Sequence, residues 1–247
     1  MISENIISFK NVTKKYGSQT ILDDLNFEIK KNKITTILGF SGAGKSTLLK
    51  HILGLSAPTR GEITCLGQDI TQLDDFSLKE FRRNFGMVFQ YAALFDSLTA
   101  VENVDFPLNE FTTLSIEERF EQASNLLISV GITEKSFNKY PSELSGGMRK
   151  RVGLARALAL SPTIMLYDEP TTGLDPITTK MVNRLIVDTA LNNKEKGLTS
   201  IIISHNIESS LKISDFIAFL DNGKIIENLP ASEFKNSKIP IIQEFLN

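Results

Sequence analysis

One eight-residue stretch, GFSGAGKS at residues 39–46, constrains the fold more than any other part of this sequence. It matches the pattern G-x4-G-K-[ST] in full and follows a short apolar run, ITTIL, at residues 34–38. Apolar residues then recur at helical spacing from Leu48 to Leu53. Strand, glycine loop and helix in this order predict a phosphate-binding loop at a helix N-terminus. The alternative, a glycine turn with an incidental lysine, does not explain the strand and helix on either side.

Each residue of this loop has an expected role. The glycines let backbone N–H groups converge on a β-phosphate, Lys45 reaches the β- and γ-phosphates, and the Ser46 hydroxyl can ligate Mg²⁺. The residues that we expect to contact the nucleotide are Gly39, Ser41, Gly42, Ala43, Gly44, Lys45, Ser46 and Thr47.

Two adjacent carboxylates, Asp168 and Glu169, end the apolar run that begins at Ile164. In open α/β sheets, ligands bind at the carboxyl ends of the strands. We expect Asp168 to hold Mg²⁺ and Glu169 to polarise the water that attacks a γ-phosphate. A solvated loop after a strand would be the preferred interpretation of such a pair by itself, but the phosphate loop favours the catalytic one.

A second glycine motif, LSGGM at residues 144–148, lies directly before a basic stretch with helical spacing, RKRVGLARALAL. Ser145, Gly146 and Gly147 would place N–H groups and a helix dipole at one point, which forms an anion site. A chain with one nucleotide loop has no obvious use for a second anion site of its own. The second site has a use if it completes the nucleotide pocket of another copy of the chain.

The remaining segments predict an α/β fold. Alternation at Leu22, Leu25, Phe27 and Ile29 indicates an antiparallel β region at the N-terminus, and strand and helix patterns alternate after residue 142, as in a mainly parallel sheet. Asp175 with Pro176 predicts a helix start, and Asp221, Asn222 and Gly223 predict a hairpin turn. We expect one domain over residues 1–247, with a helical subdomain inserted at about 71–142 and a helical tail at 231–247.

Composition excludes several classes of protein. The formal net charge is −2, which gives no broad field to attract nucleic acid or anionic lipid. The single Cys65 cannot form an internal disulfide and suits a reducing compartment. No run approaches the roughly 18 apolar residues of a membrane span, and the start does not resemble a signal peptide. We therefore expect a cytoplasmic protein. His51, on the helix after the phosphate loop, has no motif around it and is expected to be a packing residue.

The motifs, in this order and spacing, resemble the ATPase subunits of ABC transporters over nearly the whole chain. The resemblance implies a P-loop NTPase core, ATP and Mg²⁺ as ligands, and ATP hydrolysis coupled to transport. It implies that Gln90 senses Mg²⁺ and contacts a permease, that Tyr16 stacks on adenine, and that His205 contacts the γ-phosphate. Gly173-Leu174-Asp175 is similar to the family's dimer loop, which adds Asp175 to the nucleotide-binding set.

Details of the sequence narrow the class of transporter that this chain would serve. The signature ends in Met148 where most of the family has glutamine, and this departure is similar to the ATPases of MCE-type lipid transporters. The segment from Phe89 to Val104, with YAALFDSLT and VENV, resembles the same group. The alternative is an importer ATPase for small polar solutes such as amino acids. Soluble ABC proteins that act on ribosomes or DNA carry two cassettes or a long coiled-coil insert, and neither is present here.

The resemblance also implies partners. Two copies would meet head to tail, so that ATP on Lys45 of one chain meets Ser145 and Gly147 of the other. An integral permease would dock near Phe89 to Asn103, where Leu94, Phe95 and Leu98 form an apolar patch. No nucleic acid is expected, and the chain would contact the cytoplasmic face of the inner membrane only through the permease.

Overall fold

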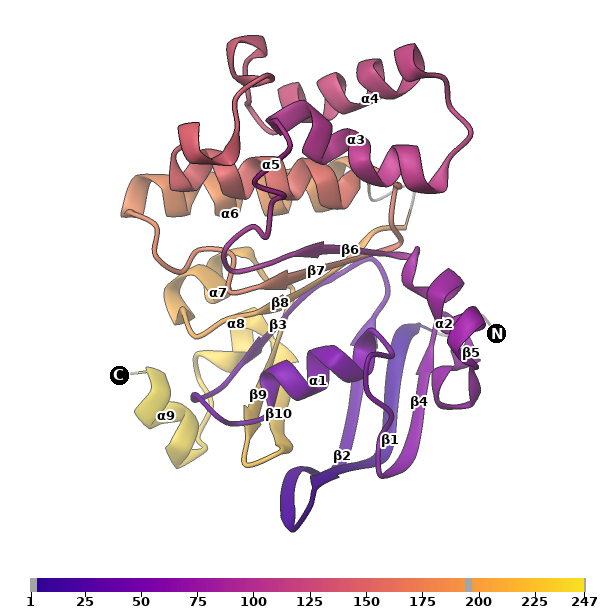
Figure 1. Cartoon of the computed structure of the whole chain (residues 1–247). Helices are drawn as coiled ribbons and strands as arrows, with labels where there is room; N and C mark the ends of the chain where they lie inside the picture. The colour runs from indigo at the N-terminus through magenta and orange to yellow at the C-terminus, as the bar shows by residue number, and fades with distance from the viewer. Residues whose placement is uncertain (1–3, 194–196, 247) are drawn as a thin grey trace. The chain divides into compact units, whose positions relative to one another are not determined.

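A computed structural model of the chain describes residues 4–193 and 197–246. The chain forms two compact units, one of Met1–Arg82 with Gly197–Asn247 and the other of Arg83–Lys196 (Figure 1). No helix among the described residues is long and apolar enough to cross a membrane.

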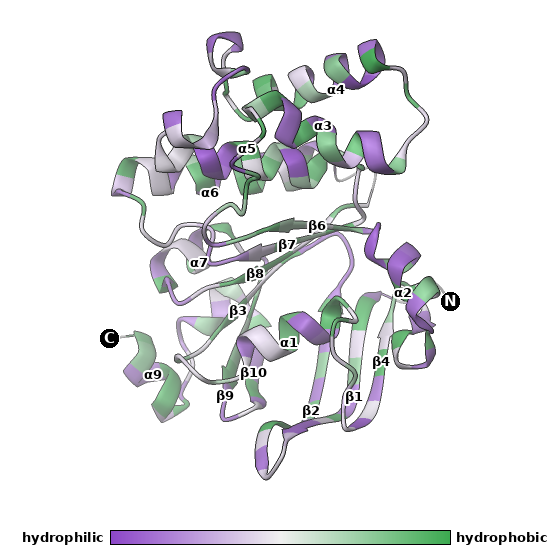
Figure 2. Ribbon diagram, viewed as in Figure 1, coloured by the Kyte–Doolittle hydropathy of each residue, from purple (hydrophilic) through white to green (hydrophobic). Residues whose placement is uncertain are grey.

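The first unit begins with an antiparallel sheet, which confirms the predicted N-terminal β region. Buried and exposed residues alternate along its strands, as expected for a sheet with one face on the core. Figure 2 shows this alternation as bands of green and purple. The strand order is β2-β1-β4-β5, with β1 at Asn5–Tyr16, β2 at Gln19–Lys30, β4 at Arg60–Cys65 and β5 at Gln68–Asp69.

A second sheet of the first unit carries the phosphate loop. Its central strand β3 (Ile34–Leu38) is buried at all five positions and pairs in parallel with β8 (Thr199–Ile203) and β9 (Phe216–Asp221). Such continuous apolar runs are typical of strands that are covered on both faces. Strand β10 (Lys224–Pro230) forms the predicted hairpin with β9. The positive φ angles of Asn222 (46°) and Gly223 (74°) are those of a type I′ turn.

The helices of the first unit include the C-terminal tail. Phe234 of the tail is fully buried against Leu38 and Phe219, so the segment after Pro230 completes the core. This packing was not predicted from its sequence. The helices are α1 (Lys45–Ile52), η1 (Ile70–Gln72), α2 (Asp75–Arg82), α7 (Ile207–Ile213), α8 (Ala231–Phe234) and α9 (Pro240–Leu246).

The second unit combines two parallel strands with four long helices. The strands are β6 (Phe85–Val88) and β7 (Ile164–Asp168). Capping boxes start two of the helices, because Thr99 and Ser115 each exchange hydrogen bonds with a glutamate three residues later. The helices are α3 (Ala100–Phe111), α4 (Ile116–Ser129), η2 (Glu134–Ser136), η3 (Pro141–Glu143), α5 (Gly146–Leu158) and α6 (Pro176–Asn192).

One detail differs from the sequence-based expectation. The segment between Thr71 and Ser142, which was expected to be helical, also contains the strand β6, which is too short to be recognised by periodicity. The bounds given above for the inserted subdomain and the tail stay predictions, and Asn247 lies outside the described residues.

The tail gives a test of the fold. We expect Phe234→Ala to lower the free energy of unfolding by about 3–5 kcal/mol, because it leaves a cavity beneath the sheet. Urea denaturation measures this loss. Phe76→Ala is the matched control, since Phe76 is 74% exposed while Phe234 is 0% exposed. Equal midpoints for wild type and Phe234→Ala would show that the tail does not contribute to the core.

Candidate nucleotide site

The predicted site residues are divided between the two units. The first unit contains the phosphate loop and the two residues expected at adenine and γ-phosphate: Gly39–Thr47, Tyr16 and His205. The second unit contains the carboxylates, the signature and the glutamine: Asp168, Glu169, Asp175, Ser145–Gly147 and Gln90.

The phosphate loop needs glycine at its two ends. A Cβ on Gly39 would lie 2.2 Å from the carbonyl oxygen of Leu220, and the φ of Gly44 is 110°, a value that L side chains rarely adopt. The Lys45 ammonium folds back over the loop and donates to the carbonyl oxygens of Gly39 (2.6 Å) and Phe40 (2.8 Å). The only charged side chain of the loop is therefore held against its backbone.

The start of α1 suits an anion. Gly44 is the N-cap residue and has no side chain to hydrogen-bond the N–H groups of the first turn. Ser46 is exposed there, and a Cβ on Gly42 would meet nothing within 4 Å. Open space, a helix N-terminus and an exposed hydroxyl together fit a phosphate group with a bound cation.

His205 lies at the same edge of the sheet as the phosphate loop. It follows β8, where the N–H of Ser204 donates to the carbonyl of Ile37 at 3.3 Å, one residue before the end of β3. The next residue, Asn206, caps α7 by accepting from the N–H of Ser209. These bonds fix the backbone on both sides of His205, whose side chain is exposed.

Tyr16 ends β1 and is also exposed. It pairs with Gln19 across the turn to β2, and the Lys14 ammonium lies 5.0 Å from the centre of its ring. Farther along β2, the carbonyl oxygen of Ile21 would lie 3.1 Å from a Cβ on Gly44. The start of β2 after the Tyr16 turn therefore lies against the phosphate loop.

In the second unit, Asp168 and Glu169 are half-buried at the end of β7. The backbone of Glu169 is left-handed, with φ of 48°, an uncommon conformation outside glycine. Thr172 stabilises this turn, because its hydroxyl donates to Glu169 Oε2 (3.0 Å) and its N–H donates to the Glu169 carbonyl (3.3 Å). The turn thus sets the position of the carboxylate that we expect to act on water.

The signature residues start α5 as predicted. Ser145 is the N-cap and its hydroxyl accepts from the N–H of Met148 at 3.3 Å. Gly147 packs against α6, where a Cβ would lie 2.6 Å from Cγ2 of Thr178. Asp175, the predicted cap of α6, accepts from the same Thr178, and that hydroxyl contact is the main cause that lowers the pKa of its carboxyl. The signature and Asp175 therefore meet at Thr178.

Gln90 is half-buried in a turn after β6. The turn closes with the N–H of Ala92 donating to the carbonyl of Phe89 at 3.0 Å. Arg156 of α5 then donates to the Ala92 carbonyl at 2.9 Å. Helix α5 thereby fixes the segment that carries the glutamine.

Sequence reasoning missed Lys150. Its side chain is only 7% exposed, and its ammonium donates to the carbonyls of Pro170 and Thr172, in the turn that follows Glu169. Burial lowers the pKa of Lys150, and the charge of Glu169 opposes that shift. The sequence held one signal of this burial. Lys150 is spaced three residues after Gly147 and four before Leu154, which puts it on the same helix face as these packed residues.

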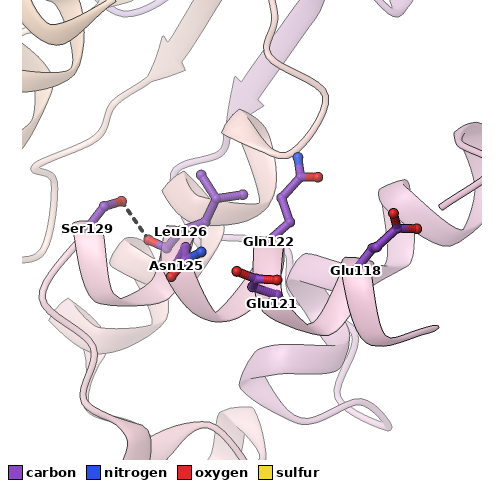
Figure 3. Close-up of a pocket in the computed structure, with 6 residues that line it drawn as sticks. All are labelled: Glu118, Glu121, Gln122, Asn125, Leu126 and Ser129. Atoms are coloured by element: carbon purple, nitrogen blue, oxygen red, sulfur yellow. Dashed lines mark hydrogen bonds between the residues drawn. The ribbon is translucent and has the colours of Figure 1, made fainter. Parts of the chain in front are cut away.

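A hollow elsewhere in the second unit does not belong to this site. It lies along α4 and none of the predicted site residues lines it (Figure 3). The residues that line it come from α4 alone: Glu118, Glu121, Gln122, Asn125, Leu126 and Ser129.

Known proteins are similar to this chain over nearly its whole length. The family model described as ABC transporter matches residues 22–172. The phospholipid-transport ATP-binding protein MlaF of Haemophilus influenzae is 40% identical over 99% of this chain and 91% of that protein. The methionine import ATP-binding protein MetN of Geobacillus kaustophilus is 40% identical over 98% of this chain and 70% of that protein.

Solved structures agree with the sequence relatives. The ATP-binding cassette MJ0796, in a dimeric post-hydrolysis state with ADP and Pi, superposes with a TM-score of 0.82 at 36% identity, over 91% of this chain and 98% of that one. The cbiO1 protein of Clostridium perfringens, from the cbiONQ transporter complex, gives 0.86 at 29% identity, over 98% and 94%.

Fold and motifs together define an ATP-binding cassette, which confirms the predicted α/β P-loop architecture. The chain belongs to the ABC transporter family, as the ATP-binding and ATP-hydrolysing subunit of a membrane transporter.

His51 of α1 gives a pH prediction. The ring is buried, Nδ1 contacts the Thr47 carbonyl at 2.8 Å, and Nε2 has no hydrogen-bond partner among the described residues. Burial is the main cause that lowers its pKa, the charge of Lys14 adds to the shift, and the Thr47 hydrogen bond opposes it. An unfolded histidine takes up a proton below about pH 6.5, whereas the folded one resists protonation. The contribution of neutral His51 to the free energy of unfolding is therefore fully present above about pH 6.5 and declines as the pH falls below it.

We expect the urea midpoint to fall between pH 7.5 and pH 5.5, and His51→Leu to reduce that fall. The control is His205→Gln, because His205 is exposed and is the only other histidine. The same pH dependence in wild type and His51→Leu would show that His51 does not cause it.

Proposed function

We propose that this ATPase subunit powers the transport of phospholipid or another lipid across the bacterial envelope, from the cytoplasmic face of the inner membrane. The observation that carries this proposal is Met148, which stands in the signature where most of the family has glutamine. The Phe89 to Val104 segment supports it, because it also resembles the MCE-type ATPases. So does the 40% identity to a phospholipid-transport ATPase.

We assign the nucleotide roles that the resemblance to the ABC ATPases implies. Lys45 and the loop of Gly39–Thr47 bind the triphosphate, Tyr16 stacks on the base, and Ser46, Gln90 and Asp168 hold Mg²⁺, which neutralises charge on the phosphates. Glu169 orients and deprotonates the attacking water, and His205 and Gln90 contact the γ-phosphate.

Two copies bind ATP head to tail. The loop of one chain holds the nucleotide, and Ser145–Gly147 with Asp175 of the other complete its surroundings, so ATP joins the two chains. The N–H groups that would bind the same phosphates come from two helix starts. One is the start of α1, where Gly44 gives no side-chain cap, and the other is the start of α5, which Ser145 caps. The dimeric form of the solved cassette MJ0796 supports this arrangement.

Glu169→Gln tests the mechanism. We expect ATP to remain bound while turnover falls at least a hundredfold, because the amide cannot accept a proton. ATP should then hold two chains together, which size-exclusion chromatography with light scattering measures. Glu117→Gln, an exposed carboxylate on α4, is the control, and Lys45→Ala should lose ATP binding. A monomeric Glu169→Gln chain with ATP bound would contradict the head-to-tail dimer.

The permease docks on the segment from Phe89 to Asn103. Phe95 is 43% exposed there, although its ring packs 4.7 Å from that of Phe106. Asn103 fixes the backbone, because its side chain accepts from the Phe95 N–H and donates to the carbonyls of Phe95 and Leu98. A rigid loop that presents an apolar ring suits a helix from a membrane subunit.

Replacing Leu94 and Phe95 with aspartate should separate the chain from its permease, because docking would bury unpaired charge. The measurement is co-purification from membranes, with ATP binding intact. Phe120→Asp is the control, since Phe120 is also exposed but lies on α4. Survival of the complex in the double aspartate variant would contradict this docking site.

A second candidate is amino-acid import, which the 40% identity to a methionine import protein favours. Cells that lack the chain distinguish the two. If the chain serves lipid transport, these cells should have an altered envelope lipid distribution and greater detergent sensitivity, with normal methionine uptake. If it serves amino-acid import, methionine uptake should fall while envelope lipids and detergent sensitivity stay normal. A co-purifying partner that binds solute in the periplasm would also support the importer.

A further inference from the structure

We propose that Lys150 is a positioning residue for ATP hydrolysis, which holds the Glu169 turn in register with helix α5. This inference rests on the proposed role of Glu169 as the residue that acts on water. Lys150 itself is not expected to touch nucleotide.

Among the described residues, the Lys150 ammonium makes its two hydrogen bonds to that turn. Its ammonium donates to the Pro170 carbonyl at 2.8 Å and to the Thr172 carbonyl at 2.9 Å. Thr172 in turn donates its hydroxyl to Glu169 Oε2 at 3.0 Å. Two hydrogen bonds in series, from Lys150 to Thr172 and from Thr172 to Glu169, therefore link α5 to the carboxylate.

The turn requires support from outside its own backbone. Glu169 has a left-handed backbone and is followed by proline, which has no N–H to donate. Residues held in such conformations persist when the surrounding structure determines them. Lys150 supplies that constraint at two carbonyls of the turn, those of Pro170 and Thr172, and its charge is opposite to that of Glu169.

The burial of Lys150 argues against an incidental surface contact. A lysine is seldom buried unless its ammonium is paired and hydrogen-bonded, because desolvating the charge is costly. The neighbouring Arg151 provides a comparison on the same helix, since its guanidinium donates to the carbonyls of Val130 (3.3 Å) and Gly131 (2.6 Å). Both cations fasten a turn to α5, but only the Lys150 turn carries a proposed site residue.

Lys150→Met removes the donors and keeps the length of the side chain. In the full chain, we expect kcat for ATP to fall about tenfold or more while KM and nucleotide affinity change less than about twofold. Lys150→Arg should restore much of kcat, because its fork can reach two carbonyls. Arg151→Met is the matched control, and it should lower thermal stability without changing kcat. Unchanged kcat in Lys150→Met, or an equal loss of kcat in Arg151→Met, would overturn the proposal.

The double variant with Glu169→Gln separates this proposal from the proposed function. If Lys150 acts through Glu169, adding Lys150→Met to Glu169→Gln should not slow single-turnover hydrolysis further. Multiplicative losses would overturn the proposal, whereas normal turnover in Glu169→Gln alone would overturn the function assigned to Glu169. If Lys150→Met does not fold, Thr172→Val decides: lower kcat at constant KM supports the link, and unchanged kcat refutes it.

Discussion

The first unit depends on the parallel pairing of β3 with both β8 and β9. All five β3 residues are buried, and the registers Ile37 to Ile203 and Leu38 to Phe219 fix where the strand ends. The carboxyl ends of parallel strands meet at one edge of a sheet, and ligands bind there in open α/β sheets. The phosphate loop begins at that point, and Gly39 is required because the backbone of Leu220 on the neighbouring strand leaves no room for a side chain.

The second unit is organised around the cations of α5. The four basic side chains of α5 donate to backbone carbonyls outside the helix: Arg149, Lys150, Arg151 and Arg156. Their targets are four separate turns, which include the Gln90 turn and the Glu169 turn. A basic helix at a glycine motif can suggest nucleic-acid binding, but here its charges are used to join loops within the unit.

Local signals were sufficient for most of the fold. The phosphate loop, the helix after the Ser145 motif, the helix start at Asp175 and the hairpin at Gly223 each depend on residues within a few positions in sequence, so they could be predicted. Strand β6 could not be, because four residues carry too little periodicity and its identity depends on pairing with β7 about 80 residues later. Lys150 was missed for the same reason, since its two acceptors lie 20 and 22 residues away in sequence.

One position of the phosphate motif, Phe40, is variable in the pattern but constrained in this chain. Its ring packs edge-on against Phe219 of β9 and against Phe245 of α9, with centroids 6.1 and 5.0 Å apart. Phe219 and Phe245 contact each other at 5.0 Å, so the three rings form one cluster. The backbone of Phe40 is also where the Lys45 ammonium donates. Phe40 therefore links the phosphate loop to the C-terminal helix α9. Because the ring of Phe245 packs against both Phe40 and Phe219, the tail is anchored to the loop and to β9 at the same point.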